Sequence, residues 1–292
     1  MGDRIAMANA VDERVITALE TLDYSPLKII GNGELTVVLG WPDDDPEWVL
    51  KPTGPFGDRE CQHFMDTINT YAAELRARNV GVIDTDVVRV TRPDGQFMSY
   101  MVQPVLPQDQ LAEHALASFE PDPENPILTG VADALAACDN TIAIDAPISN
   151  WSFDGERVHL LDVGLPLMWD ETGTCSYDAA LVGPAFPAAL RRVMVSEVAK
   201  IFERYRDPRV AAVEFVGRLP FFGYEAWVEP AAQCLNKRLD LADPVDPIEA
   251  AKFIAGDTKT IPLLKRMQRI QRTWERRVRR RRYEYFIGES TY

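Results

Sequence analysis

The sequence has 292 residues, of which 46% are hydrophobic and 26% charged, a composition typical of one large or two modest globular domains. This composition excludes a disordered chain, a collagen-like repeat and a disulfide-rich miniprotein. No run of about 18 apolar residues is present, so we expect no membrane-spanning helix. Because no basic region precedes an apolar stretch at the N-terminus, we expect a cytoplasmic protein.

Charge is distributed unevenly along the chain. The net charge is −14, but residues 265–282 carry ten basic residues and one acid, which leaves −23 on the rest. An acidic body repels nucleic acid and anionic membranes, so we predict a small-molecule partner and neither of these for the body. The C-terminal segment alone could attract either.

The first third of the sequence is typical of strands around one long helix. Short apolar runs separated by turn residues, such as Gly31-Asn32-Gly33, indicate antiparallel strands. Apolar residues three or four positions apart indicate helices. The predicted elements are a helix over 11–22, strands over 27–30, 35–39 and 48–51, a helix over 64–78, and strands over 82–90 and 96–105.

After Pro107 most of the pattern is helical. We therefore predict an α+β protein with an N-terminal lobe over 1–106, built on a small antiparallel sheet with one long helix, and a mainly helical C-terminal lobe over 107–292. The helices of the second lobe are predicted over 109–118, 126–137, 187–206, 208–217, 224–235 and 262–285.

One hairpin interrupts the helical part. Asp154-Gly155 is a strong signal for a two-residue turn, which pairs Phe153 with Glu156 and places Asn150 opposite His159. Asp162 then lies about three residues, roughly 10 Å, further along the strand. Asp145 stands five residues before Asn150 in a loop-like run. The sequence thus brings two acids and an amide to one end of the hairpin.

Asp162 ends an apolar strand just before Gly164, where the backbone is free to turn. A buried carboxylate needs a partner, because an unpaired buried charge is costly. A divalent cation shared by Asn150 and Asp162 would meet this need with the oxygen ligands that such ions prefer.

These residues resemble the motifs of the protein-kinase-like superfamily, in particular its small-molecule branch of aminoglycoside and choline phosphotransferases. The chain is also similar to a bacterial family of kinase-like proteins of unknown function. Asp145 to Asn150 matches the catalytic Asp-x-x-x-x-Asn, Asp162-Val163-Gly164 matches Asp-Phe-Gly, and the strand ending at Lys51 matches Val-Ala-Ile-Lys. The resemblance covers roughly residues 27–205 and implies a two-lobed kinase-like fold.

The resemblance also implies roles for these side chains. Lys51 would contact the α and β phosphates of ATP, and Asn150 and Asp162 would hold Mg²⁺. Asp145 would orient the acceptor hydroxyl and take its proton. The remaining expected cofactor contacts are the turn Gly31, Asn32 and Gly33 over the phosphates, and Gln103 and Val105 in the connection beside adenine.

The sequence departs from the family pattern in several places. Thr36 stands where a third glycine is usual, and Ala143-Ile144 stands where His-Arg or His-Gly precedes the catalytic aspartate. No Ala-Pro-Glu follows, which disfavours a protein substrate. A helix acid should pair with Lys51, and both Glu60 and Glu74 are candidates.

The resemblance leads us to expect an ATP- and Mg²⁺-dependent phosphotransferase acting on a hydroxyl of a small molecule. One alternative is a catalytically inactive, pseudokinase-like protein that binds nucleotide or serves as a scaffold. Another is a kinase-fold enzyme that transfers AMP. Retention of Lys51, Asp145, Asn150 and Asp162 favours catalysis, whereas Ala143-Ile144 favours the inactive alternative.

The C-terminal segment contains a helical stripe of apolar residues. We expect this stripe to dock on the helical lobe, with the arginines facing the acidic body or water. The alternative is an anionic site for a phosphate-bearing substrate or a nucleic acid. The stripe consists of Leu263, Met267, Ile270, Trp274 and Val278.

Overall fold

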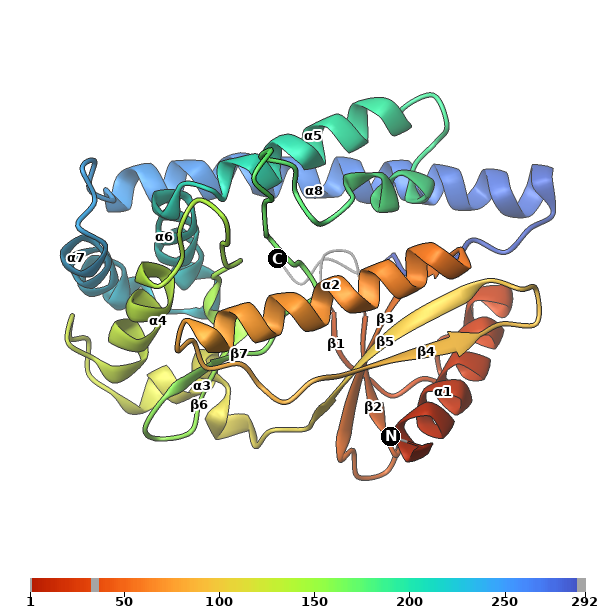
Figure 1. Ribbon diagram of the computed structural model, residues 1–292, viewed down its shortest axis with the longest axis horizontal. Helices are drawn as coiled ribbons and strands as arrows, with labels where there is room; N and C mark the ends of the chain where they lie inside the picture. Colours follow the sequence, from red (N-terminus) through yellow and green to blue (C-terminus); the bar gives the residue numbers. More distant parts are fainter. Residues whose placement is uncertain (1, 33–36, 288–292) are drawn as a thin grey trace.

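The computed structural model describes residues 2–32 and 37–287 and shows an α+β protein built around a five-stranded antiparallel sheet (Figure 1). The strand order is β1-β2-β3-β5-β4, and one long helix packs on each face. The predicted α+β class, with a small antiparallel sheet and many helices, is therefore confirmed; Gly33 lies outside the described residues. The elements of this region are α1 Gly2–Thr21, β1 Ile29–Asn32, β2 Val37–Trp41, β3 Trp48–Phe56, α2 Asp58–Ala77, β4 Asp86–Thr91 and β5 Phe97–Pro104.

The two faces of the sheet belong to different hydrophobic cores. On one face α1 packs through residues such as Val15 and Leu19 against Leu39 and Tyr100. On the other face α2 packs through residues such as Ile68, in a core that continues without a break into the helical region. This second core spans the predicted lobe boundary at residue 106, so the sheet and the helices are firmly joined.

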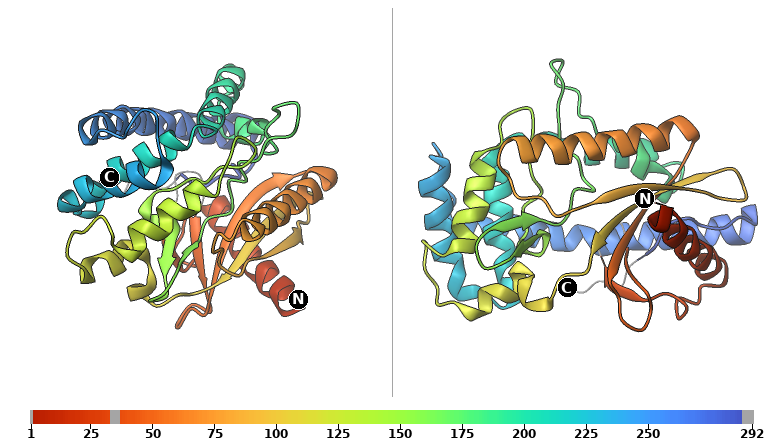
Figure 2. Two further views of the ribbon diagram at one scale, coloured as in Figure 1. Left: turned by 60° about the vertical axis from the view of Figure 1, so that its left-hand side comes forward. Right: turned by 60° about the horizontal axis from the view of Figure 1, so that its bottom comes forward.

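The helical region lies beside the sheet and contains one two-stranded ribbon (Figures 1 and 2). The helix predicted over 109–118 is divided into three short pieces, and the last helix begins at Pro247, fifteen residues before its predicted start. None of the described helices is both long and apolar enough to cross a bilayer. The elements are η1 Gln108–Gln110, α3 Ala112–Ala115, η2 Leu116–Ser118, α4 Pro126–Ala136, η3 Ile148–Asn150, β6 Trp151–Phe153, β7 Val158–Leu160, η4 Ala179–Ala185, α5 Arg191–Arg204, α6 Pro208–Arg218, η5 Leu219–Phe222, η6 Glu225–Trp227, α7 Val228–Leu239, α8 Pro247–Trp274 and the π-helical η7 Glu275–Arg279.

The register of the β6–β7 hairpin differs from the prediction. Phe153 pairs with Val158 instead of Glu156, because the Asp154 carboxylate accepts hydrogen bonds from the backbone N–H groups of Glu156 and Arg157 and closes a four-residue loop. The two-residue shift keeps each side chain on its predicted face. It also brings Asn150 opposite Leu161, immediately next to Asp162, instead of opposite His159.

The apolar stripe of α8 does not dock on the helical region, contrary to the prediction. Ala250 and Ile254 are buried in the first half of α8, which packs against α6. Eleven residues, about three turns, separate Ile254 from Lys265, so the same face of the continuous helix later presents Lys265 and Gln268 to the protein. The stripe lies on the opposite face and is exposed.

A buried ion-pair network joins α1, the sheet and the C-terminal segment. The Arg92 guanidinium donates to both carboxylate oxygens of Asp12, at 2.9 and 2.7 Å, and to Glu284 at 2.7 Å. The Tyr100 hydroxyl donates to Asp12 at 2.8 Å. The chain after η7 is held in addition by Tyr283, whose hydroxyl donates to the carbonyl of Ala185.

Replacing Asp12 by alanine should therefore destabilise the fold strongly. The Arg92 side chain is fully buried, so it would keep its charge with only Glu284 as counterion. We expect Asp12→Ala to lower the free energy of unfolding by about 3–5 kcal/mol. Chemical denaturation measures the change, with Glu13→Ala on the exposed side of the same helix as control, where we expect a loss below about 0.5 kcal/mol. Equal losses in both variants would contradict the importance of the network.

Candidate functional site

Lys51 and Asp162, more than a hundred residues apart, meet at the peptide group of Leu161. The Lys51 ammonium donates from its Nζ to the Leu161 carbonyl oxygen at 3.2 Å, and the Gln103 side chain donates to the same oxygen at 2.8 Å. Lys51 lies in the middle of β3, where only 9% of its surface is exposed. The sheet thus directs the ammonium group at the residue that precedes Asp162.

The backbone of Leu161 also positions Asn150. The Leu161 N–H donates to the carbonyl oxygen of Asn150 at 2.8 Å. The Asn150 side chain donates from Nδ2 to two atoms of Asp145, the backbone oxygen and Oδ2, both at 3.1 Å. Since both neighbouring atoms are acceptors, the NH₂ group must face Asp145, and Oδ1 of Asn150 is left for another ligand.

Asp162 is fixed by the turn that follows it. Its Oδ1 accepts a hydrogen bond from the Gly164 N–H at 2.9 Å. A Cβ atom at position 164 would lie 2.7 Å from Cε of Met101 and 3.0 Å from Asp162 Oδ1. Met101 pairs with Lys51 across β3 and β5. A larger residue at position 164 would therefore require the end of the Met101 side chain to move, because the turn packs against the strands that carry Lys51.

The loop before Asp145 is held by residues other than the missing histidine or arginine. The buried Tyr71 hydroxyl of α2 donates to the Ala143 carbonyl at 2.7 Å, and the Ala143 N–H donates to the Leu167 carbonyl at 2.9 Å. The Trp151 indole donates to the Ala146 carbonyl at 3.0 Å. Hydrogen bonds to backbone carbonyl groups thus fix this loop, although the sequence lacks the histidine or arginine that is usual before the catalytic aspartate.

Asp145 belongs to a buried chain of polar side chains. The Tyr205 hydroxyl lies 3.1 Å from Asp145 Oδ1 and also bonds to Glu214, whose other oxygen accepts from Arg218 at 2.8 Å. A phenol carries one proton, so two hydrogen bonds between Tyr205 and two carboxyl groups require a second proton. Because Arg218 pairs with Glu214, Asp145 is the group that holds this proton.

The electrostatic environment of Asp145 agrees with this arrangement. Burial, followed by the negative charges of Glu214 and Asp162, raises the pKa of Asp145 to about 8, against the opposing effects of Tyr205 and Arg218. A carboxyl group with such a pKa is protonated at neutral pH in the absence of a cation. Once ionised it is a stronger proton acceptor than an ordinary aspartate.

The other predicted cofactor contacts lie around the edge of this cluster. Gly31 and the backbone of Asn32 are in β1, paired with Val38 and Val37 of β2. The Gln103 side chain binds Leu161 and Thr85. The Val105 N–H already donates to the Glu47 carbonyl at 2.9 Å, which leaves the Val105 carbonyl as the group that can meet a ligand.

Neither predicted acid of α2 contacts Lys51. Glu60 accepts from the Gly57 N–H at 2.9 Å and caps the helix, while Glu74 pairs with Arg78 at 2.6 Å. The face of α2 that packs against the sheet carries Phe64, Ile68 and Tyr71 instead. Within the described chain, Lys51 therefore has a neutral carbonyl as its hydrogen-bond partner.

Within residues 2–32 and 37–287, no three His, Cys, Asp or Glu side chains are grouped to hold a metal ion. A site made from Asn150 and Asp162 offers one amide oxygen and one carboxylate. Mg²⁺ commonly binds one or two protein oxygens and completes its shell with water and phosphate oxygens. The donor set therefore fits a magnesium ion that arrives with a nucleotide.

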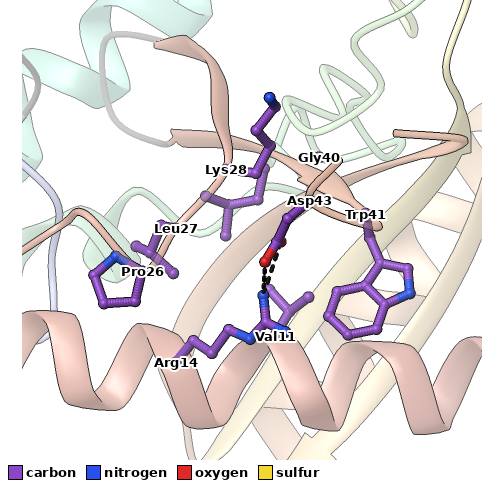
Figure 3. A pocket seen from close by; sticks show the side chains of 9 residues that line it. Val11, Arg14, Pro26, Leu27, Lys28, Gly40, Trp41 and Asp43 are labelled. Atoms are coloured by element: carbon purple, nitrogen blue, oxygen red, sulfur yellow. Dashed lines mark hydrogen bonds and ion pairs between the residues drawn. The ribbon is translucent and has the colours of Figure 1, made fainter. Parts of the chain in front are cut away.

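Two surface hollows lie away from Lys51 and Asp162. One lies between α1 and the β1–β2 edge, where Arg14 forms an ion pair with Asp43 beside Trp41 (Figure 3). The other lies behind the Asp145 loop and is lined in part by Ala143 and Tyr205. The second hollow reaches the polar chain from the side opposite to Asn150.

Sequence reasoning did not identify Tyr71, Tyr205, Glu214 and Arg218 as part of this cluster. A signal was present for Glu214, which is the one acid within the apolar run Ala211 to Gly217 of α6 and has Arg218 one turn later. Tyr71 and Tyr205 follow the apolar pattern of their helices, and only the packing shows where their hydroxyl groups point.

The raised pKa of Asp145 predicts a pH dependence of stability. The folded state holds a proton that the unfolded state releases near pH 4, so the stabilising contribution is complete below that value and is lost as the pH rises toward 8. Without nucleotide or metal, the free energy of unfolding of wild type should decline over this range by at most about 1.4 kcal/mol per pH unit because of Asp145. The Asp145→Asn variant should lack this decline. Urea denaturation between about pH 5 and about pH 8 measures it.

Asp154→Asn is the matched control. Hydrogen bonds from Arg157, Glu156 and His159 lower the pKa of Asp154 to about 2, so this residue is ionised in both states across the measured range. Its substitution should leave the slope unchanged. If the free energy of unfolding varied with pH in the same way in wild type and Asp145→Asn, the assignment of the proton to Asp145 would be wrong.

Comparisons with known proteins give a family match and structural likenesses. No curated protein matches the sequence. Among solved structures, the chain is similar to one described as "WaaP in complex with acyl carrier protein", at 15% identity over 74% of this chain and 92% of that chain, with a TM-score of 0.33. These values are too low to assign a fold or an activity.

The family match covers the centre of the chain. A family model described as "Family of unknown function (DUF6206)" matches residues 54–244, a range that contains Asp145, Asn150, Asp162 and the Tyr205–Glu214 pair. Lys51 and the whole of α8 lie outside it. Since the model matches more than half of the sequence, the chain belongs to the DUF6206 family.

Proposed function

We propose that this protein is an ATP- and Mg²⁺-dependent phosphotransferase that acts on a hydroxyl of a small molecule. The observation that carries the proposal is the hydrogen bond from Lys51 to the Leu161 carbonyl, beside Asp162 and Asn150. This contact supports the proposal because Lys51, Asp145, Asn150 and Asp162 are the four side chains that phosphoryl transfer in a kinase-like fold would require. The two-lobed arrangement, with lobes over 1–106 and 107–292, and a cytoplasmic location are part of this proposal.

Lys51 is the phosphate-binding group of the proposal. A largely buried ammonium whose partner is a neutral carbonyl is poorly compensated, and an anionic ligand would lower its free energy. The phosphates of ATP supply such charges. The turn that contains Gly31, Asn32 and Gly33 would cover them, and the Val105 carbonyl would accept a hydrogen bond from adenine, with Gln103 holding Leu161 in place.

Asn150 Oδ1 and the Asp162 carboxylate would hold Mg²⁺, which would neutralise phosphate charge when bound. Asp145 Oδ2 contacts Asn150, and Asp145 Oδ1 contacts Tyr205, so the carboxyl group is held in one orientation. Asp145 would orient the acceptor hydroxyl and take its proton. Catalysis would then come from positioning and charge neutralisation.

Within the described residues Lys51 forms no ion pair with either predicted acid of α2, and this favours a second candidate. Glu60 and Glu74 are both occupied elsewhere, so Lys51 lacks the ion pair that holds this lysine in active protein kinases. A protein that binds nucleotide without transferring phosphate, or that transfers AMP, is compatible with this arrangement. The mass of the product separates phosphate transfer from AMP transfer.

Substitution of Asp162 should impair binding, whereas substitution of Asp145 should impair turnover. Asp162→Asn should weaken binding of Mg²⁺ with ATP at least tenfold, because it removes the charged ligand of the metal. Asp145→Asn should bind nearly as wild type but lose turnover by at least about a hundredfold, because it removes the proton acceptor. Calorimetric titration with ATP and Mg²⁺ measures binding, and ATP consumption with a metabolite library measures turnover.

Asp154→Asn, at the exposed tip of the same hairpin, is the control and should leave both quantities unchanged. Equal affinity for ATP and Mg²⁺ in wild type and Asp162→Asn would refute the metal assignment. Binding that depends on Asp162, with no product from any acceptor and no loss of ATP, would support the nucleotide-binding alternative.

A further inference from the structure

The second half of α8 exposes large apolar side chains along one face. Leu263, Ile270, Trp274 and Val278 are each between 51% and 56% exposed, although apolar residues of this size are usually buried. They recur at intervals of four or seven residues over about 22 Å of helix. Figures 1 and 2 show α8 along one edge of the molecule.

The opposite face of this helix segment is polar and buried. Lys265, Gln268 and Gln271 are each at least nine-tenths buried against the protein. A helix that only covers a core places its apolar residues inward and its polar residues outward. In this segment polar side chains are buried and large apolar side chains are exposed. The exposed stripe therefore does not contribute to the folding of the chain.

Arginines accompany the stripe, and their charge is not neutralised. Five of them are exposed and form no ion pair within residues 2–32 and 37–287: Arg266, Arg269, Arg277, Arg280 and Arg281. The acid within this segment, Glu275, is 12% exposed and is bound to Gln271 and Arg279. The outer surface of residues 263–281 therefore combines apolar side chains with a positive charge that has no internal counterion.

We propose that this apolar and basic face of α8 docks the protein on an anionic lipid surface. A helix lying in the interface of a membrane buries its apolar side chains among the acyl chains and places arginines at the lipid phosphates. Trp274 fits the same depth, because its ring is apolar and its N–H is polar. The acidic remainder of the chain is repelled by such a surface, so contact is confined to this face.

The exposure of the stripe favours lipid over other occupants. The four apolar residues of the stripe are each more than half exposed, and none of them lines either of the two hollows described above. A bilayer adapts to such exposed side chains, whereas a protein partner needs a matching groove. A second copy paired through the same face would place arginines against arginines. A nucleic acid would leave the aliphatic side chains of Leu263, Ile270 and Val278 without an apolar partner.

The test uses the full chain and two kinds of vesicle, phosphatidylcholine alone and about three parts phosphatidylcholine to one part phosphatidylglycerol. Wild type should sediment with the anionic vesicles only, and binding should fall as salt is raised. The double variant Ile270→Glu with Arg277→Glu should bind at least tenfold more weakly. Both residues are exposed, so the fold should be retained, which circular dichroism verifies.

Ile5→Glu with Arg59→Glu is the matched control, because it makes the same chemical changes at exposed positions on α1 and α2. It should bind vesicles as wild type does. Absence of binding to anionic vesicles at low salt, or equal loss in the control, would overturn the proposal. The proposal would also be overturned if wild type did not bind vesicles but bound RNA, or formed a dimer in light scattering, and the α8 variant lost that binding or dimerisation. No outcome depends on ATP, so the proposed phosphotransferase can fail while this inference stands.

Discussion

The arrangement of the site depends on the backbone N–H and C=O groups of Leu161. Its carbonyl accepts from Lys51 and Gln103 of the sheet, and its N–H donates to Asn150 of the helical region. Three segments that are distant in sequence are thereby fixed against one short strand. Since main-chain geometry is stiff, Asp162, the next residue, inherits a defined position between the ammonium and amide groups. Contacts between side chains alone would not fix the position of Asp162 as closely.

The charges around Asp145 explain why the site is suited to a cation and an anionic ligand together. The negative charges of Glu214 and Asp162 both disfavour the ionised form of Asp145, and Arg218 forms an ion pair with Glu214. Lys51 lies on the other side with a neutral partner. The site thus holds unsatisfied charge of both signs, which a metal–nucleotide complex would satisfy in one binding event.

Helix α8 shows how packing at one end of a helix determines exposure at the other. Contacts with α6 fix the rotation of the helix at Ala250 and Ile254, and a continuous helix carries this phase through its whole length. The apolar stripe is therefore exposed although its periodicity alone suggests a buried face. The Arg92 network and Tyr283 then hold the chain after the helix, so the outward orientation is maintained from both ends.

The sequence by itself determined the α+β class, the antiparallel strands around one long helix, and the order of Lys51, Asp145, Asn150 and Asp162, because hydrophobic periodicity and turn residues act over short distances. It did not determine the hairpin register, since an Asp154 side chain competed with the expected turn. Nor did it determine the partners of Lys51 and Asp145, or the orientation of α8. These depend on contacts between residues far apart in the chain, such as Tyr205 with Asp145 and α6 with α8, and only the tertiary packing decides which of the compatible contacts form.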